Sequence, residues 1–233
     1  MSPDSDDLAP AEVPLSDEDR RLVASWAVDC AERALPLFEA KAPGDTRPRE
    51  AIEGTRAFAV GGKRTARLRT LAWAALAAGR EVGDPVATAA ARAASAAAGT
   101  PYIHALATPH QANHIHGPAL YQAQARELAA GGDPDVGDEE IRWAIEHASP
   151  ALREVVRRFP AGRPSRSRLG LLKHQLDTGL RRGPASSGKA KYPLQRAAEP
   201  SPHRRPVDGR RDRGERGAHR DPVRVAPYDS VKP

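Results

Sequence analysis

Residues 85–99 read PVATAAARAASAAAG, and this stretch decides the fold class. Asp84 followed by Pro85 is typical of a helix start, and nine alanines lie between Pro85 and Ala98. Alanine has the highest helix propensity of all residues, but its side chain has almost no bulk to bury. A helix of this composition must therefore pack close to its neighbours. The uncharged stretch 93–125, which overlaps its end, is expected to be the buried centre of a soluble helical bundle.

Apolar residues at three- and four-residue spacing predict helices on both sides of this stretch. Ser16, with Asp19 three residues later, forms an approximate capping box for a helix that carries Leu22, Trp26 and Cys30. Asp138 is expected to cap the helix that carries Ile141. Further helices are expected to start near Pro48, Arg64, Pro109, Pro150 and Arg168.

The sequence predicts an all-α protein, a multi-helix bundle of about seven or eight antiparallel helices with a disordered C-terminal tail, because no segment shows the alternating pattern of a strand. We expect a disordered acidic arm over 1–14, one helical domain over 15–181 and a disordered basic Arg/Pro-rich tail over 182–233. The net charge of +6 is divided unevenly along the 233 residues. Residues 181–233 hold 14 basic and 6 acidic residues, whereas residues 1–180 hold 22 and 24.

The ends of the chain and its single cysteine limit the compartment and the chemistry. The acidic start is the opposite of the positive segment that an export signal needs, so we expect a cytoplasmic protein. The uncharged stretch 93–125 contains three prolines and four histidines, which argues against a membrane span. Cys30 is the single cysteine of the sequence, so an internal disulfide is excluded. We expect Cys30 to be a buried, inert thiol.

Histidines form the most noticeable local cluster of the sequence: His104, His110, His114 and His116. His110 and His114 have the spacing of a two-histidine metal pair, but the sequence HQANH lacks the glutamate of the zinc-protease motif. We expect no metal and no cofactor, and interpret these imidazoles as hydrogen-bonding groups. A helical metal- or small-ligand-binding protein that uses the cluster is kept as an alternative. No nucleotide-binding loop or serine-hydrolase motif is present, and we expect no enzymatic activity.

Two charged segments are candidates for contact with a macromolecular partner, although ion pairing between helices or helix capping also explains them. The first is the loop with Asp45, Arg47, Arg49 and Glu50. The second is the acidic segment with Asp133, Asp135, Asp138, Glu139 and Glu140. A second alternative function is a nucleic-acid-associated protein that acts through weak, nonspecific contacts of the basic tail.

Three stretches together resemble a bacterial family of immunity proteins from polymorphic toxin systems. They are CAERALPLFEAKAPGDTRPREAIEGTRAFAVGG (30–62), HIHGPALYQAQARELAAGGDP (114–134) and DEEIRWAIEHASPALREVVRRFP (138–160). The similarity spans about Leu15 to Leu180. It implies an all-helical protein that binds and neutralises a cognate protein toxin in the cytoplasm, without catalysis. Such a contact buries about 800 Å² per partner. The similarity assigns no catalytic residues.

Overall fold

The computed structural model describes residues 10–163 and 165–182, and the described residues form eight α-helices, one short 3-10 helix and no β-strand. The all-α prediction is confirmed, while the antiparallel order of neighbouring helices stays a prediction. Residues 183–233 of the predicted tail and residues 1–9 of the predicted arm lie outside the described residues, while Arg182, the first residue of the predicted tail, is the last residue of α8. The elements are α1 (Asp17–Glu39), α2 (Arg47–Ala59), α3 (Ala66–Val82), α4 (Pro85–Gly99), η1 (Thr100–Tyr102), α5 (Pro109–Ala129), α6 (Pro134–Glu146), α7 (Pro150–Arg157) and α8 (Arg168–Arg182).

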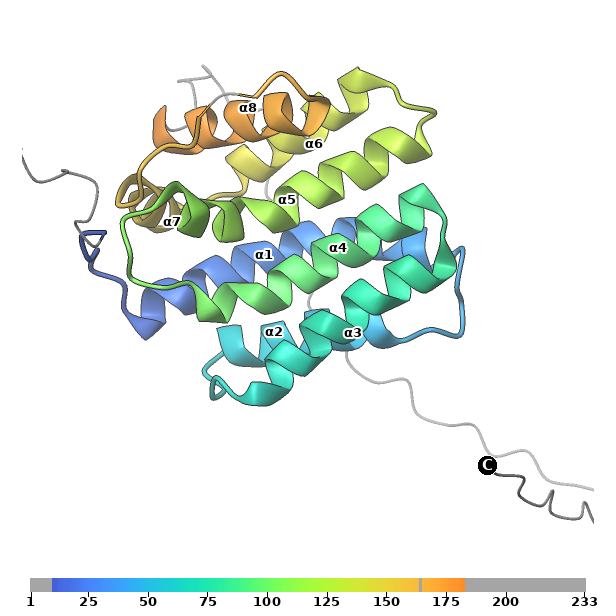
Figure 1. The fold of residues 1–233 in the computed structure, drawn as a ribbon, viewed down its shortest axis with the longest axis horizontal. Helices are drawn as coiled ribbons and strands as arrows, with labels where there is room; N and C mark the ends of the chain where they lie inside the picture. The colour runs from blue at the N-terminus through green and yellow to red at the C-terminus, as the bar shows by residue number, and fades with distance from the viewer. Residues whose placement is uncertain (1–9, 164, 183–233) are drawn as a thin grey trace, which may run out of the picture. The chain divides into compact units, whose positions relative to one another are not determined.

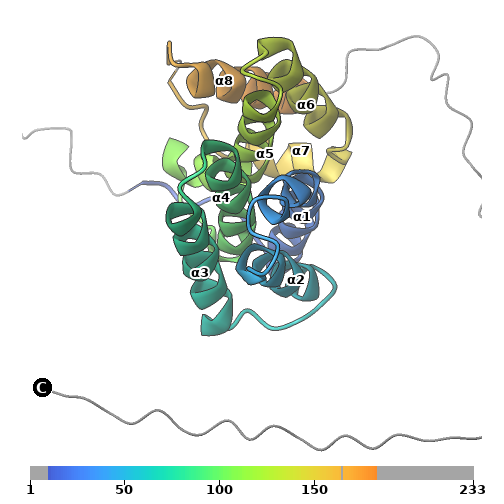
Figure 2. The ribbon, with the colours of Figure 1, turned by 90° about the vertical axis from the view of Figure 1, so that its right-hand side faces the viewer.

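Helix α4 lies among α1, α2, α3 and α5 and forms the centre of this part of the molecule (Figures 1 and 2). Eight of its alanines are buried. A Cβ built on Gly79 of α3 would lie 2.9 Å from the Cβ of Ala91, so the two helices approach too closely for any larger side chain at this point. The hydroxyl of Thr88 donates a hydrogen bond to the carbonyl of Gly79 at 2.7 Å. Small side chains therefore set the distance between α3 and α4.

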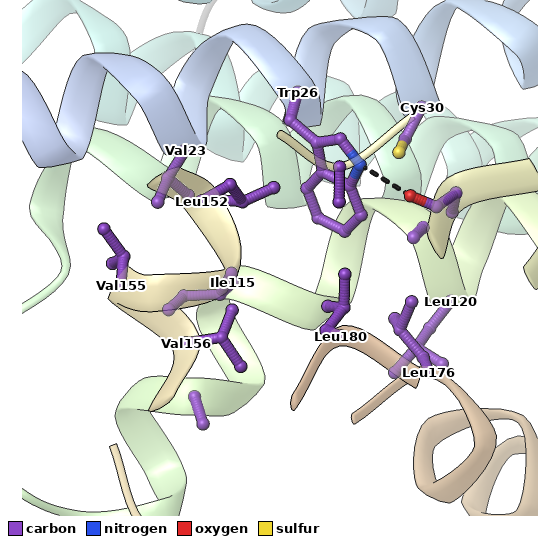
Figure 3. Packing of buried hydrophobic residues seen from close by; sticks show 14 of the residues in the cluster. Val23, Trp26, Cys30, Ile115, Leu120, Leu152, Val155, Val156, Leu176 and Leu180 are labelled. Carbon is purple, nitrogen blue, oxygen red and sulfur yellow. Dashed lines mark hydrogen bonds between the residues drawn. The ribbon is translucent and has the colours of Figure 1, made fainter. Parts of the chain in front are cut away.

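Bulky side chains form a second core region, where α1 packs with α5, α6, α7 and α8. Trp26 of α1 points into this region, and its indole N–H donates a hydrogen bond to the carbonyl of Ala144 in α6 at 3.0 Å (Figure 3). Burial of the tryptophan is compatible with its polar N–H because the donor has a partner. Helix α1 thus contacts both the alanine-rich and the bulky parts of the core. No described helix has the length and apolar character needed to cross a membrane.

Helix starts follow the expected capping chemistry at most positions. Ser16 and Asp19 form the complete capping box of α1, and the side chain of Asp84 accepts a hydrogen bond at the start of α4. The expected cap at Asp138 is wrong, because α6 begins one turn earlier, at Pro134, with Asp133 as its N-cap. Gly137 does not interrupt the helix. A Cβ at this position would lie 2.0 Å from a carboxylate oxygen of Glu127, so the glycine makes room for that side chain.

The last residues of the predicted acidic arm pack on the helical domain. The N–H of Val13 donates to the carbonyl of Ala105 at 3.1 Å, and the N–H of Ala107 donates to the carbonyl of Ala11 at 2.7 Å. Val13 itself is buried. These hydrogen bonds satisfy backbone groups of both segments. The composition of the arm did not predict this packing.

Candidate functional site

The charged loop at the start of α2 uses its charges within the chain. Arg47 donates to Asp45 at 2.9 Å and to Glu81 of α3 at 3.1 Å. The hydrogen bond from Arg47 lowers the pKa of Asp45 below its usual range. Arg49 pairs with Glu39 of α1, and Glu50 accepts a hydrogen bond from the Thr46 hydroxyl. The charged side chains of this loop therefore pair between helices within the chain. Arg47 links α2 to α3, and Arg49 links α2 to α1.

The acidic segment around the start of α6 divides into exposed and paired residues. Asp133, Asp135 and Glu139 are exposed. Asp133 caps α6, and Glu139 lies 3.6 Å from Arg142 one turn later. Asp138 accepts a hydrogen bond from Arg168 of α8 at 2.9 Å. Asp133, Asp135 and Glu139 are thus the members of this segment that a partner can reach most directly.

Glu140 is a structural residue of the core and not part of an exposed surface. It is 5% exposed. Its carboxylate accepts hydrogen bonds from Arg33 of α1 at 2.8 Å and from Arg126 of α5 at 3.1 Å, and also from the Gln122 amide. Buried charge is tolerated when it is paired and hydrogen-bonded in this way. Glu140 therefore ties α6 to α1 and α5. The sequence holds a signal for this burial, because Gly137, Glu140 and Ala144 lie on one helix face.

The four predicted histidines do not form one site. His110 and His114 are exposed, with their Nε2 atoms 3.3 Å apart. Partial burial, together with the neighbouring His110 and His104, lowers the pKa of His114. His116 points instead toward α8, where its Nε2 lies 3.3 Å from a carboxylate oxygen of Asp177. Among the described residues, no three His, Cys, Asp or Glu side chains converge as ligands of a metal ion.

Burial controls the ionisation of His116 and of Cys30. Desolvation lowers the pKa of His116 to about 4, in spite of the attraction of Asp177, so the ring is neutral at pH 7. Burial also raises the pKa of the Cys30 thiol well above its usual range. A thiol in this state is a poor nucleophile. The interpretation of Cys30 as a buried thiol is confirmed.

An open groove of about 550 Å³ lies between α3, α4 and α5, and Tyr102 of η1 also lines it. Its lining includes small residues of α4 and α5, such as Ala96, Gly99 and Gly117. Trp73, which is 68% exposed, comes from α3, and Tyr102 and Tyr121 come from η1 and α5. None of the sequence patterns above predicted this groove. A signal was present in the sequence, because Trp73 is a large aromatic residue that lies off the helix face carrying the buried Leu68, Ala75 and Ala78.

His104 and His114 also line the groove, together with Arg69 and Asn113. The guanidinium of Arg69 lies over the ring of Tyr102, 4.3 Å from its centroid. The groove therefore combines apolar aromatic surface with cationic and neutral polar groups. These are the residue types that anchor macromolecular contacts.

The position of Glu140 predicts a contrast with its neighbour in the sequence. Glu140→Ala removes the acceptor of Arg33 and Arg126, so we expect the free energy of unfolding to fall by about 1–3 kcal/mol. Glu139→Ala is the matched control, with an expected change below about 0.5 kcal/mol. Urea denaturation at pH 7 measures both. Equal effects of the two substitutions would contradict the structural assignment of Glu140.

The neutral state of His116 predicts a pH-dependent stability. Because its folded pKa of about 4 lies below the usual 6.5, the unfolded chain takes up a proton first as the pH falls. The stability from neutral His116 is thus complete above about pH 6.5 and is lost as the pH falls toward 4. Between pH 7 and 4.5 we expect this group to account for about 2–3 kcal/mol of lost stability.

Urea denaturation of His116→Gln at both pH values tests this assignment. The variant should lose less stability on acidification than the unsubstituted chain. His174→Gln, at an exposed histidine of α8, is the control and should keep the full pH dependence. The assignment fails if His116→Gln and the unsubstituted chain lose the same amount.

Comparison with known proteins identifies one family. The family model described as "Imm-5 like putative immunity protein" matches residues 14–151, from just before α1 to the first residues of α7. No curated protein matches the chain, and no solved structure matches it either. The match covers more than half of the 233 residues. The chain therefore belongs to the Imm-5 like immunity protein family.

Proposed function

We propose that the chain is an immunity protein that binds a cognate toxin of a polymorphic toxin system in the cytoplasm and neutralises it without catalysing a reaction. The observation that carries the proposal is the family match over residues 14–151, which includes all of α1 to α6. Neutralisation by binding needs a surface of about 800 Å² on each partner that occludes the toxin's active site or substrate surface. It needs no cofactor and no reactive side chain.

The packing of the described residues suits a protein that binds through a preformed surface. Ion pairs join neighbouring helices, including Arg33–Glu140 between α1 and α6 and Arg56–Glu32 between α2 and α1. A surface that is already rigid loses little conformational entropy on association, which favours tight binding. The same property favours specificity for one toxin, because a rigid surface cannot adapt to others.

The exposed acidic residues Asp133, Asp135 and Glu139 supply negative charge that attracts a basic surface of the toxin. Exposed charges at the rim of an interface mainly change the association rate. The charged side chains of the candidate loop at the start of α2, by contrast, already have ion-pair or hydrogen-bond partners within the chain. These residues are Asp45, Arg47, Arg49 and Glu50. We therefore place the electrostatic contact at the start of α6 rather than at this loop.

Co-expression in bacteria tests the proposed function. A toxin encoded beside this chain's gene should arrest growth when expressed alone and should be tolerated when the chain is expressed with it. A toxin that remains lethal in the presence of the chain would contradict the proposal.

The double variant Asp135→Lys/Glu139→Lys then tests the acidic contact. It leaves the Asp133 cap intact, and we expect about a ten-fold slower association with the inactivated toxin, measured by surface plasmon resonance. Glu53→Lys/Glu146→Lys changes the net charge equally at exposed residues of α2 and α6 and is the control. Equal rates for the two double variants would remove the acidic segment from the interface.

A further inference from the structure

Charge is divided unequally within the helical domain. Residues 54–126 hold eight Lys and Arg residues but only two acidic residues, Glu81 and Asp84. Both acidic residues already have partners outside this range: Glu81 pairs with Arg47, and Asp84 pairs with Lys41 at 3.1 Å. In the described part of the chain, no acidic residue lines the groove between α3, α4 and α5. This groove therefore presents a positive to neutral surface, whereas residues 10–53 of the same domain hold 10 acidic and 6 basic residues.

The groove exists because α4 is made of small residues. Ser95, Ala96 and Gly99 lie where α3 and α5 flank α4, and none of them is large enough to fill the space between the flanking helices. Gly117 of α5 also contributes, because a Cβ there would lie 3.2 Å from the Cβ of Ala96. The composition that brings the helices close together in the core thus leaves a hollow at the surface.

Arg69 stands at the groove with its charge unneutralised by any described carboxylate. Its guanidinium lies over the ring of Tyr102. This stacking fixes the orientation of the guanidinium and leaves its N–H groups available as hydrogen-bond donors. A carboxylate is the group that such a fork binds best, through two parallel hydrogen bonds. The imidazoles of His104 and His114 line the same groove and supply further donors or acceptors.

Trp73 gives the groove an apolar contact surface in addition to the charge of Arg69. It is a large hydrophobic side chain that is 68% exposed, and Leu76 of the same helix lines the groove next to it. Tryptophan and arginine are the residue types most enriched among the energetically dominant positions of protein interfaces. An apolar side chain of a partner that covers Trp73 would remove its surface from water.

We propose that this groove is the main toxin-docking site and that it receives a toxin segment in which an acidic residue stands beside an aromatic or aliphatic residue. The acidic residue pairs with Arg69, and the apolar residue packs on Trp73. This inference rests on the proposed function. The groove and the acidic start of α6 together require a toxin with two features. One is a basic surface that faces α6, and the other is a separate segment with an acidic residue beside an apolar residue.

A protein segment fits the groove better than a nucleic acid does. Nonspecific binding of a nucleic-acid strand needs several cations along a track of phosphates. Among the described residues that line the groove, Arg69 is the one Lys or Arg, and the rest of this lining is mostly alanine, glycine and aromatic side chains. A single carboxylate with an apolar neighbour matches this arrangement, whereas a phosphate backbone does not.

Binding to the catalytically inactivated toxin encoded beside this chain's gene tests the proposal. We expect Trp73→Ala and Arg69→Glu each to weaken the dissociation constant at least ten-fold, measured by isothermal titration calorimetry. The effect of Arg69→Glu should shrink in high salt, because screening weakens the charge interaction, while the effect of Trp73→Ala should persist. Circular dichroism checks that both variants keep the fold.

Two control variants match these changes away from the groove. Leu171→Ala shortens another exposed apolar residue, in α8, and Arg80→Glu reverses another exposed arginine of α3. Both should bind the toxin within about two-fold of the unsubstituted chain, since surface positions outside an interface contribute little. Losses as large as those of the groove variants would show a general effect of charge or stability and would overturn the proposal.

The possible outcomes separate this inference from the proposed function. If the unsubstituted chain binds the toxin and the groove variants bind equally well, the groove is overturned while the function stands. If the unsubstituted chain does not bind, the function and the inference both fail. A 20-nucleotide single-stranded DNA is the second probe. If Arg69→Glu loses affinity for this DNA but keeps its affinity for the toxin, the groove belongs to nucleic acid and the proposal is wrong.

Discussion

The close approach of α3 and α4 at Gly79 and Ala91 is the constraint on which the rest of the structure depends. Alanine side chains bury little area individually, so α4 contributes to stability through close packing with four neighbours rather than through bulk. The large side chains are concentrated where α1 meets α5 to α8. One helix thus determines both how tightly the first helices pack and where the surface is left hollow.

The periodicity of the sequence was sufficient to predict the helices and several of their ends, because local interactions define them. The capping box of Ser16 and Asp19 and the start of α4 at Asp84 are examples. The start of α6 was predicted at Asp138, five residues after the actual N-cap, Asp133. Gly137 lies inside α6 and leaves room for the side chain of Glu127, a tertiary contact that single-sequence patterns do not show.

The candidate site was less predictable, because charge in a sequence does not show which partners a side chain has already found. Glu140 was assigned to an exposed acidic segment, but Arg33 and Arg126 reach it from α1 and α5. His116 was grouped with three other histidines, but it points toward Asp177 of α8. The groove is formed by α3, α4, α5 and η1, which are separate in the sequence. Its depth depends on glycines and alanines, whose side chains are too small to fill the space between the helices. Only Trp73 marked it in the sequence.

Stability measurements on Ala91→Leu test the central claim most directly. Leucine at this position must enter the space between α3 and α4, so the free energy of unfolding should fall by about 1–3 kcal/mol, and by more if the helices cannot separate. Ala57→Leu, at an exposed residue of α2, should change it by less than about 0.5 kcal/mol. An Ala91→Leu variant as stable as the unsubstituted chain would contradict the account, because it would mean that small side chains do not set the distance between α3 and α4.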